Sequence, residues 1–486
     1  MIRKNVLISY STEAVNLTAS LFFVGYFIRS YSTSIYGDFI VLTSLISFLT
    51  LYNFGVDSTL KAEYGKKEST PDRLLILFRS LTTITIFGLA ALSIAILLLT
   101  LQSNSIINND IFLLAINYDF YILGSICLIF FSIIQAHILL SVNFLLERTY
   151  NSAINLTSLA ATFLAAQFKL EFTYFLTLRL LFLITLGLIL LTYTLQREKI
   201  SFRKAYHYSL SALSSNQIYL SLKSSLKYIS LGASSLVIWS IDPIIIRSAL
   251  SNQDVGTYSL IFRFITLGFF LPTAICTAIT PNLSKFSANN SHHELTSLYQ
   301  STFHTLLIIF LLFAFPVIFF LDFIINNWIG HELVTSVAVR FILLGWAGLM
   351  FINSLNTSII ILTGSANFFL VLVLFAEALL HVTLSLILVN KFHLEGIAFS
   401  ALISLALTTL PFQFYLIKNK LKIYEREKLF RDIIFSIILY TISLITIFIS
   451  YHHFKNATMS VILFISFTLF CTTRYIKHGH LTRLLG

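Results

Sequence analysis

The sequence predicts an all-α integral membrane protein with about fourteen transmembrane helices. Of its 486 residues, 57% are hydrophobic and only 11% are charged, against about 25% charged residues in an ordinary soluble domain. A soluble globule with so few charges would expose an almost wholly apolar surface, and a disordered chain would lack the many Phe, Leu and Ile residues found here. The apolar residues also gather in runs of about 20 residues, the length that crosses a bilayer as a helix.

Fourteen apolar runs give the candidate helices in chain order. The first six lie at about 6–28, 39–60, 74–101, 119–146, 149–168 and 172–195. Beyond a polar, basic stretch, six more lie at about 226–249, 257–283, 302–325, 338–363, 368–389 and 396–417, and the last two at about 433–451 and 458–473. The basic stretch divides the chain into two predicted six-helix lobes, residues 1–200 and 226–417, followed by two additional helices within residues 433–474. The first run lacks a small-residue cleavage pattern, so we expect a spanning helix rather than a signal peptide.

The distribution of Lys and Arg predicts the orientation in the membrane, because these residues accumulate in cytoplasmic loops. With a cytoplasmic N-terminus, 23 of the 32 Lys and Arg residues fall on the cytoplasmic side, four on the opposite side and five within or at the edge of spans. We therefore expect both termini in the cytoplasm. The net charge of +11 follows from this topology, so nucleic acid is not expected as a partner.

A short segment recurs in the two predicted lobes. The first copy begins at Arg29 and ends in Tyr36-Gly37-Asp38-Phe39, and the second begins at Arg247 and ends in Val255-Gly256-Thr257-Tyr258. By itself so short a match fits chance as well as common descent. Both copies lie in the outer loop between the first and second spans of a lobe, however, and both lobes enter the membrane from the cytoplasm. A parallel repeat of this kind is one basis of transporters whose halves rock about a central site.

Further motifs are spread over the whole chain. Asn53-Phe54-Gly55-Val56-Asp57 closes the second span, Ile241-Asp242-Pro243 opens a motif in the seventh, Pro281-Asn282-Leu283-Ser284-Lys285 follows the eighth, and Phe392-His393-Leu394-Glu395-Gly396-Ile397-Ala398 precedes the twelfth. With these motifs and the two repeat copies, the sequence resembles the Wzx-type polysaccharide (O-antigen) flippases of the MATE-like multidrug/oligosaccharidyl-lipid/polysaccharide superfamily. It departs from that family at Leu394, where glycine is frequent.

The resemblance implies a flippase in the bacterial cytoplasmic (inner) membrane. Such a protein carries an undecaprenyl-pyrophosphate-linked oligosaccharide, an O-antigen or capsule repeat unit, from the cytoplasmic to the periplasmic leaflet by alternating access. The resemblance also implies that the two six-helix lobes surround a central cavity lined by the first, second and eighth spans. The implied partners are the polyprenyl-linked substrate, the lipid bilayer, and a polymerase and chain-length regulator of the same pathway.

Polar side chains within the spans are the candidate substrate-binding residues, because a charge at the centre of a helix costs about 2.5–3.5 kcal/mol on insertion. The candidates for the cavity are Glu13, Asn16, Asp57, Arg179, Asp242, Arg247 and Arg263. Arg179 and Arg263 are the best candidates for contact with a pyrophosphate or an acidic sugar, since guanidinium groups pair with phosphate oxygens in a bidentate way. Interhelical packing is the alternative for the Ser and Thr residues on the same faces. Snorkelling to the interface is equally compatible with Arg247 and is expected of Arg340.

Two further features lie in the second predicted lobe. Glu377 and His381 are four residues apart in the eleventh span, with Ser385 one turn beyond. This pair fits a proton relay and equally fits a mutually satisfied structural pair. Pro243 is expected to bend the seventh span, because proline removes a backbone donor from the helix.

Flipping requires no nucleophile, metal or cofactor, and none is predicted. Cys127, Cys276 and Cys471 lack metal-ligand spacing, and there is no Walker A pattern for ATP. One alternative is a membrane polysaccharide polymerase or ligase, which would be expected to present catalytic residues in a large outer loop; the longest, about 102–118, has only Asp110 as a clear acid. The other alternative is a MATE-like drug exporter, for which an acid-rich cavity without arginine would be expected.

Overall fold

A computed structural model describes most of the predicted helical segments. The described residues are 2–49, 76–83, 85, 89, 93, 114, 117–125, 128, 131, 134–135, 144–197, 234, 236–269, 272, 275–276, 279, 286, 291–330, 336–362 and 368–420. Every regular element within them is a helix, which confirms the all-α class. The count of fourteen stays a prediction, and the two helices expected within 433–474 lie outside the described residues.

The chain divides into two compact units, Met1–Ser259 and Leu260–Gly486. The boundary expected from the sequence, between residues 200 and 226, lies outside the described residues. The two lobes inferred from the sequence therefore remain a prediction, and each unit is described by itself below.

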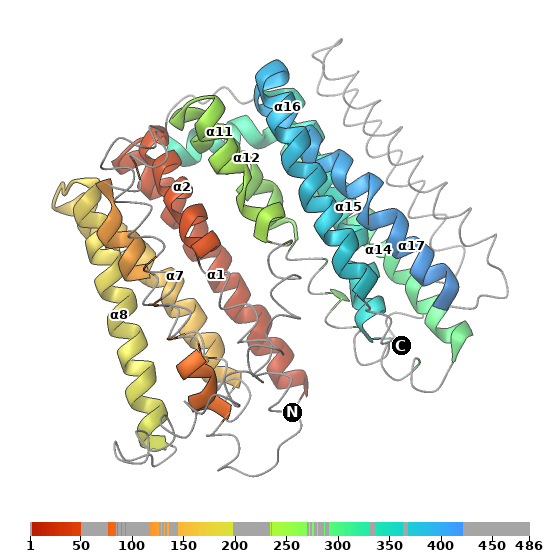
Figure 1. Cartoon of the computed structure of the whole chain (residues 1–486), viewed down its shortest axis with the longest axis horizontal. Coiled ribbons are helices and arrows are strands. Elements are labelled where there is room, and N and C mark those ends of the chain that lie inside the picture. The colour runs from red at the N-terminus through yellow and green to blue at the C-terminus, as the bar shows by residue number, and fades with distance from the viewer. Residues whose placement is uncertain are drawn as a thin grey trace. The chain divides into compact units, whose positions relative to one another are not determined.

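Four long helices pack together in the first unit (Figure 1). They are α1 (Ile2–Ser30), α2 (Thr33–Leu49), α7 (Phe144–Gln167) and α8 (Phe172–Arg197). Helix α1 contacts α2 and α7, and α7 contacts α8. These helices overlap the first, second, fifth and sixth apolar runs, so hydropathy alone located them.

A cluster of aromatic rings joins these helices near their connecting turns. The Phe27 ring of α1 lies 5.6 Å from that of Phe39 in α2 and 5.1 Å from that of Phe175 in α8, and all three side chains are buried. The Tyr31 hydroxyl, between α1 and α2, donates to the Leu170 carbonyl between α7 and α8 at 3.0 Å. The two connections are thereby fixed to each other, which places the start of α2 firmly.

The seventh apolar run is broken, as its proline predicts. Helical residues 236–240 end at a bend at Ile241, and α11 (Asp242–Ala249) begins immediately beyond it with Pro243 in its first turn. Proline is tolerated there because the first-turn N–H groups have no intrahelical acceptor. The bend expected at Pro243 is therefore confirmed. Helix α12 (Asn252–Leu267) follows after two residues.

The second unit is built from α14 (His292–Ile329), α15 (Val337–Leu362), α16 (Phe368–Leu407) and α17 (Thr409–Lys420) (Figure 1). Helix α15 contacts each of the other three, and α16 also contacts α17. Helix α14 ends at Gly330, whose φ of 81° gives a left-handed cap that glycine adopts without strain. In the core the Trp346 ring lies 5.3 Å from Phe262 and 5.6 Å from Phe269.

Helix α16 is a tight helical hairpin rather than a single rod. Its backbone leaves the helical region at His393, where φ is 49° and ψ is −130°. Ser400 bonds to both His381 and Ser385, 19 and 15 residues earlier. In a straight helix a separation of 15 residues spans about 22 Å, so the two arms must fold back on each other. The eleventh and twelfth spans predicted on either side of Phe392–Gly396 are therefore confirmed as separate arms.

Several helices are long and apolar enough to cross a membrane. They cover Phe172–Arg197, His292–Ala314, Val337–Ile360 and Phe369–Lys418, with shorter apolar helices at Ala14–Ser30 and Thr33–Phe48. The segment Phe369–Lys418 would be about 75 Å long if straight, far more than a hydrocarbon core of about 30 Å. Its fold at His393 makes it two crossings, in keeping with a multi-pass membrane protein.

Candidate functional site

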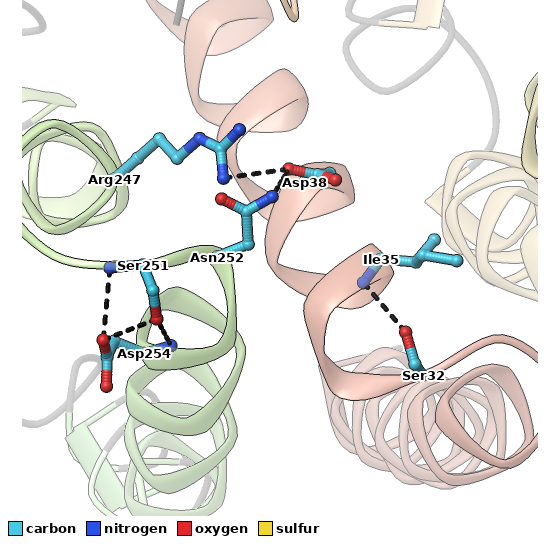
Figure 2. A network of polar contacts seen from close by, with 7 residues as sticks. All are labelled: Ser32, Ile35, Asp38, Arg247, Ser251, Asn252 and Asp254. Atoms are coloured by element: carbon cyan, nitrogen blue, oxygen red, sulfur yellow. Dashed lines mark hydrogen bonds and ion pairs between the residues drawn. The ribbon is translucent and has the colours of Figure 1, made fainter. Parts of the chain in front are cut away.

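The two copies of the recurring segment contact each other in the first unit. The first copy provides the start of α2, and the second provides the end of α11 and the start of α12 (Figure 2). We call the residues at this contact, Gly37, Asp38, Arg247, Asn252 and Gly256, the repeat junction. The recurrence in the sequence indicated that the segment mattered, and the structure adds that its two copies are partners.

The Asp38 carboxylate is the polar centre of the repeat junction. Its Oδ1 atom accepts a hydrogen bond from Asn252 Nδ2 at 2.7 Å and lies 3.7 Å from Arg247 Nη1 (Figure 2). The side chains of Asp38 and Arg247 are each 18% exposed, so this ion pair is only partly screened by solvent. Arg247, predicted either to bind substrate or to snorkel, thus interacts with an acid of the other copy.

A local cap holds Asn252 in position beneath Asp38. At the start of α12, Asp254 Oδ2 accepts hydrogen bonds from the Ser251 hydroxyl at 2.6 Å and from the Ser251 backbone N–H at 3.1 Å (Figure 2). Ser251 Oγ in turn accepts from the Asp254 N–H at 3.2 Å. Such reciprocal bonds satisfy N–H groups that a helix start leaves free, and the cap fixes the first residue of α12.

Two glycines permit the backbones of the copies to touch. A Cβ atom at Gly37 would overlap the carbonyl oxygen of Asn252 and would lie 3.2 Å from the Gly256 nitrogen. A Cβ atom at Gly256 would overlap the carbonyl oxygen of Thr33. Close helix approach over small residues is a common means of association in membranes. Each glycine is therefore required by the backbone of the opposite copy.

Removing the acceptor of the repeat junction should destabilise the first unit. We expect Asp38→Ala to lower the free energy of unfolding by about 0.5–1.5 kcal/mol, because the half-buried Asn252 amide loses its acceptor. Asp38→Asn should cost less, since its amide oxygen can still accept from Asn252. Unfolding in detergent, followed by intrinsic fluorescence, measures both, and Asp119→Asn at an exposed acid is the matched control. Equal losses for Asn and Ala at position 38 would contradict this account.

Asp242 lies at the start of α11, the helix whose end carries Arg247 of the repeat junction, and is also held by a protein partner. The Tyr258 hydroxyl donates to Asp242 Oδ2 at 2.9 Å, and both side chains are buried. The bond connects the first residue of α11 to α12 across the short connection between them. Asp242 therefore stabilises the bent seventh span in this structure.

Arg179 of α8 is surrounded by protein groups. Its Nε donates to Ser158 Oγ of α7 at 3.0 Å, and its Nη1 donates to the Tyr121 hydroxyl. Its guanidinium carbon lies 5.0 Å from the Phe39 ring centroid and 5.8 Å from that of Tyr121, within the range of cation–π attraction. The structure thus shows Arg179 joining α8 to α7, to α2 and to residue 121, whereas the sequence suggested contact with a phosphate.

The remaining cavity candidates are less completely described. Asn16 of α1 has a buried amide oxygen that finds no hydrogen-bond partner in the described part of the chain. The side chain of Glu13, and Asp57 altogether, lie outside the described residues. Arg263 lies on α12 and is partly buried. Thr43, Ser47 and Thr266 donate to carbonyls of their own helices, which satisfies these hydroxyls locally.

Glu377 and His381 lie inside the α16 hairpin of the second unit. Their side chains are 3% and 1% exposed. Glu377 Oε2 accepts a hydrogen bond from the Thr409 hydroxyl, and His381 Nδ1 lies 3.1 Å from Ser400 Oγ. The two residues are on the face of the first arm that packs against the second arm.

A neutral polar network in the second unit was missed by sequence reasoning. Tyr299 of α14 donates to Asn356 Oδ1 of α15 at 2.9 Å, and Gln413 Nε2 of α17 donates to Asn353 Oδ1 at 2.6 Å. Asn356 Nδ2 and Gln413 Oε1 are buried and have no hydrogen-bond partner among the described residues. The sequence does carry a sign of this network, namely two asparagines and a glutamine inside apolar runs. These neutral amides stand out less than charged residues do.

Arg340 also differs from expectation. It is 2% exposed and pairs with Asp322 of α14, so it does not snorkel. The Arg340 side chain is buried between α14 and α15, where an unpaired guanidinium charge would be costly. Asp322 supplies the opposite charge. Within the described part of the chain, no group of three His, Cys, Asp or Glu residues is arranged to hold a metal ion.

Comparison with known proteins identifies the fold. Residues 229–387 match the MatE family. The structure is similar to the lipid II flippase MurJ in an inward closed conformation, with a TM-score of 0.70, 16% identity, and coverage of 98% of this chain and 99% of that chain. It is also similar to a multidrug resistance MATE family transporter of the MOP superfamily in an inward-facing conformation, with a TM-score of 0.63, 14% identity, and coverage of 86% and 99%. No curated protein matches the sequence. The chain has the fold of the MOP-superfamily transporters.

Proposed function

We propose that this chain is a flippase that moves a polyprenyl-pyrophosphate-linked oligosaccharide, such as an O-antigen or capsule repeat unit, from the cytoplasmic to the periplasmic leaflet of a bacterial inner membrane. The polyprenyl tail stays in lipid, so only a head group of hydroxyls and phosphates has to pass the hydrocarbon layer. Alternating access of two lobes supplies that path. We further propose a polymerase and a chain-length regulator of the same pathway as partners.

One observation carries this proposal. The likeness to the lipid II flippase extends over 98% of the chain, whereas the likeness to the MATE transporter extends over 86%. The lipid II flippase therefore also matches a part of this chain that the MATE transporter does not cover. Its name describes the flipping of a lipid-linked substrate. The matched proteins are transporters rather than enzymes, which disfavours a polymerase or ligase.

The repeat junction has the properties expected of a closure point between rocking halves. Its polar part is one hydrogen bond and one partly exposed ion pair, and an exposed ion pair is worth about 1 kcal/mol or less. Its glycines allow two flat backbones to meet without interlocked side chains. The topology predicted from Lys and Arg puts both copies on the outer side. We propose that the repeat junction closes that side and parts when substrate is released.

Drug export is the second candidate, because residues 229–387 match the MatE family. One assay separates the two functions. Purified protein is reconstituted in liposomes containing a fluorescent polyprenyl-pyrophosphate oligosaccharide, and dithionite quenching measures how much reaches the outer leaflet. A flippase accelerates this exchange and leaves ethidium uptake unchanged, whereas an exporter does the reverse.

Arg263 provides a test at the level of one residue. We expect Arg263→Ala to reduce flipping at least about tenfold, since a charge-assisted contact with phosphate contributes about 1.5–3 kcal/mol. Arg263→Lys should retain part of the activity because the charge remains. Surface polysaccharide in cells and flipping in liposomes both report the effect.

The matched control for this test is Arg197→Ala. Arg197 lies at the exposed end of α8, where it donates to Tyr193 of its own helix at 2.7 Å. Its loss should leave flipping unchanged. Normal flipping by Arg263→Ala, at wild-type levels of protein in the membrane, would remove Arg263 from the proposed site.

A further inference from the structure

The two arms of the α16 hairpin and the start of α17 enclose a line of polar side chains in an apolar setting. Each member is at most 3% exposed. We call this set the hairpin polar line, and its members are Glu377, His381, Ser385, Ser400, Ser404 and Thr409. Hydroxyl groups alone would suffice to hold two membrane helices together, so the presence of a carboxyl group and an imidazole calls for another explanation.

Hydrogen bonds connect the titratable members to hydroxyls of the second arm and of α17. Thr409 donates to Glu377 Oε2, and Ser400 bonds to both His381 Nδ1 and Ser385. Glu377 and His381 are four residues apart in the first arm, which makes them neighbours on one face of the helix. Carboxyl, imidazole and hydroxyl groups can each donate and accept a proton, so the line combines proton-binding groups with proton-conducting neighbours.

Other charged groups on the packed elements have different surroundings. Arg340 of α15 pairs with Asp322, and Glu395 accepts from Ser336 at 2.5 Å. The remaining such groups with described side chains, Lys391, His393 and Lys418, are exposed. Among the described residues packed on the hairpin, Glu377 and His381 are therefore the titratable pair that faces its interior.

The charge on this pair depends on whether the hairpin is dry. With one proton between them the pair is neutral overall, either as carboxylic acid and imidazole or as carboxylate and imidazolium. Without that proton it carries one negative charge, which a dry interior strongly disfavours. A closed hairpin, as seen here, thus favours the one-proton pair, and loss of the proton requires water to enter.

We propose that Glu377 and His381 together bind one exchangeable proton that drives the flipping cycle. This inference rests on the proposed function and names its energy source. On release, the O–H bond of Glu377 or an N–H bond of the imidazolium breaks and the proton passes to water. A carboxylate and a neutral imidazole remain, and uptake from the other side reverses the step. Hydration of the hairpin is thereby coupled to its protonation.

A pH gradient across reconstituted liposomes tests the proposal. With one proton per substrate, a gradient of one pH unit should set up about a tenfold ratio of fluorescent polyprenyl-pyrophosphate oligosaccharide between the leaflets. Glu377→Gln, whose amide oxygen can still accept from Thr409, should bring that ratio back to about one. The matched control is Thr383→Ala, because Thr383 lies on the exposed face of the same arm and donates to its own helix. It should retain the ratio.

A second measurement does not depend on the substrate. Infrared difference spectra of the purified protein between acidic and alkaline pH should show a titrating carboxyl band that Glu377→Gln removes. Absence of flipping by the wild type with this band present would contradict the proposed function and not the proton site. A wild-type ratio in Glu377→Gln, a ratio set by a sodium gradient at constant pH, or a band that survives the substitution would overturn the proton site.

Discussion

Adding one methyl group at Gly37 or at Gly256 is expected to abolish transport. The new Cβ atom would overlap a backbone carbonyl of the opposite repeat copy, and a backbone atom cannot rotate away as a side chain can. Overpacking of this kind costs about 1–3 kcal/mol. Gly37→Ala and Gly256→Ala should therefore separate α2 from α12 and lower flipping in liposomes by at least about tenfold.

Other glycines supply graded controls for this experiment. A Cβ atom at Gly345 would meet Leu402 at 3.6 and 3.8 Å, which are ordinary contacts, so Gly345→Ala should leave flipping unchanged. The three atoms nearest to a Cβ atom at Gly187 all belong to the ring of Phe131, a side chain that can shift, so Gly187→Ala should have an intermediate effect. Wild-type flipping by both Gly37→Ala and Gly256→Ala would show that the backbone contact is not needed.

Replacing Arg179 by methionine is expected to lower stability by about 2–4 kcal/mol. The change removes hydrogen bonds to Ser158 and Tyr121, at about 1–3 kcal/mol, and cation–π contacts with Phe39 and Tyr121, at about 0.5–2 kcal/mol. Arg179→Lys should rescue little, because an ammonium group lacks the planar fork that reaches two partners. Denaturant unfolding in detergent measures both variants.

The same variant decides between the two roles of Arg179. If the residue is structural, flipping by Arg179→Met should fall only in proportion to the fraction of folded protein. If it binds phosphate, flipping should fall while the unfolding midpoint stays unchanged. Leu181→Ala, at an exposed position of the same helix, is the control for side-chain loss.

Much of the fold could be predicted because hydropathy and helix-breaking residues act locally. The apolar runs located the described spans, and Pro243 marked the bend before α11. The motif at residues 392–396 marked the turn of the α16 hairpin, although the left-handed φ falls on His393 rather than on a glycine. Gly396 is needed nearby, because its Cβ atom would overlap the backbone of Leu388.

The partners of the polar residues could not be predicted, because they come from distant parts of the chain. The recurrence of Gly37 and Gly256 was visible, but nothing local showed that Asp38 would accept from Asn252, 214 residues later. Arg179 stands out in the sequence as a charge inside a span, yet its partners lie on other parts of the chain. Asn356 and Gln413 were passed over because neutral amides give a weaker signal than charges.

The contact between the two glycines also limits how the chain can evolve. Each copy presents its flat surface to the backbone of the other, so a larger side chain cannot be accommodated by adjusting one copy alone. A lineage that lost either glycine would gain little by keeping the remaining one. Across homologous genes the two positions should therefore be retained together or replaced together, which an alignment of such genes can establish.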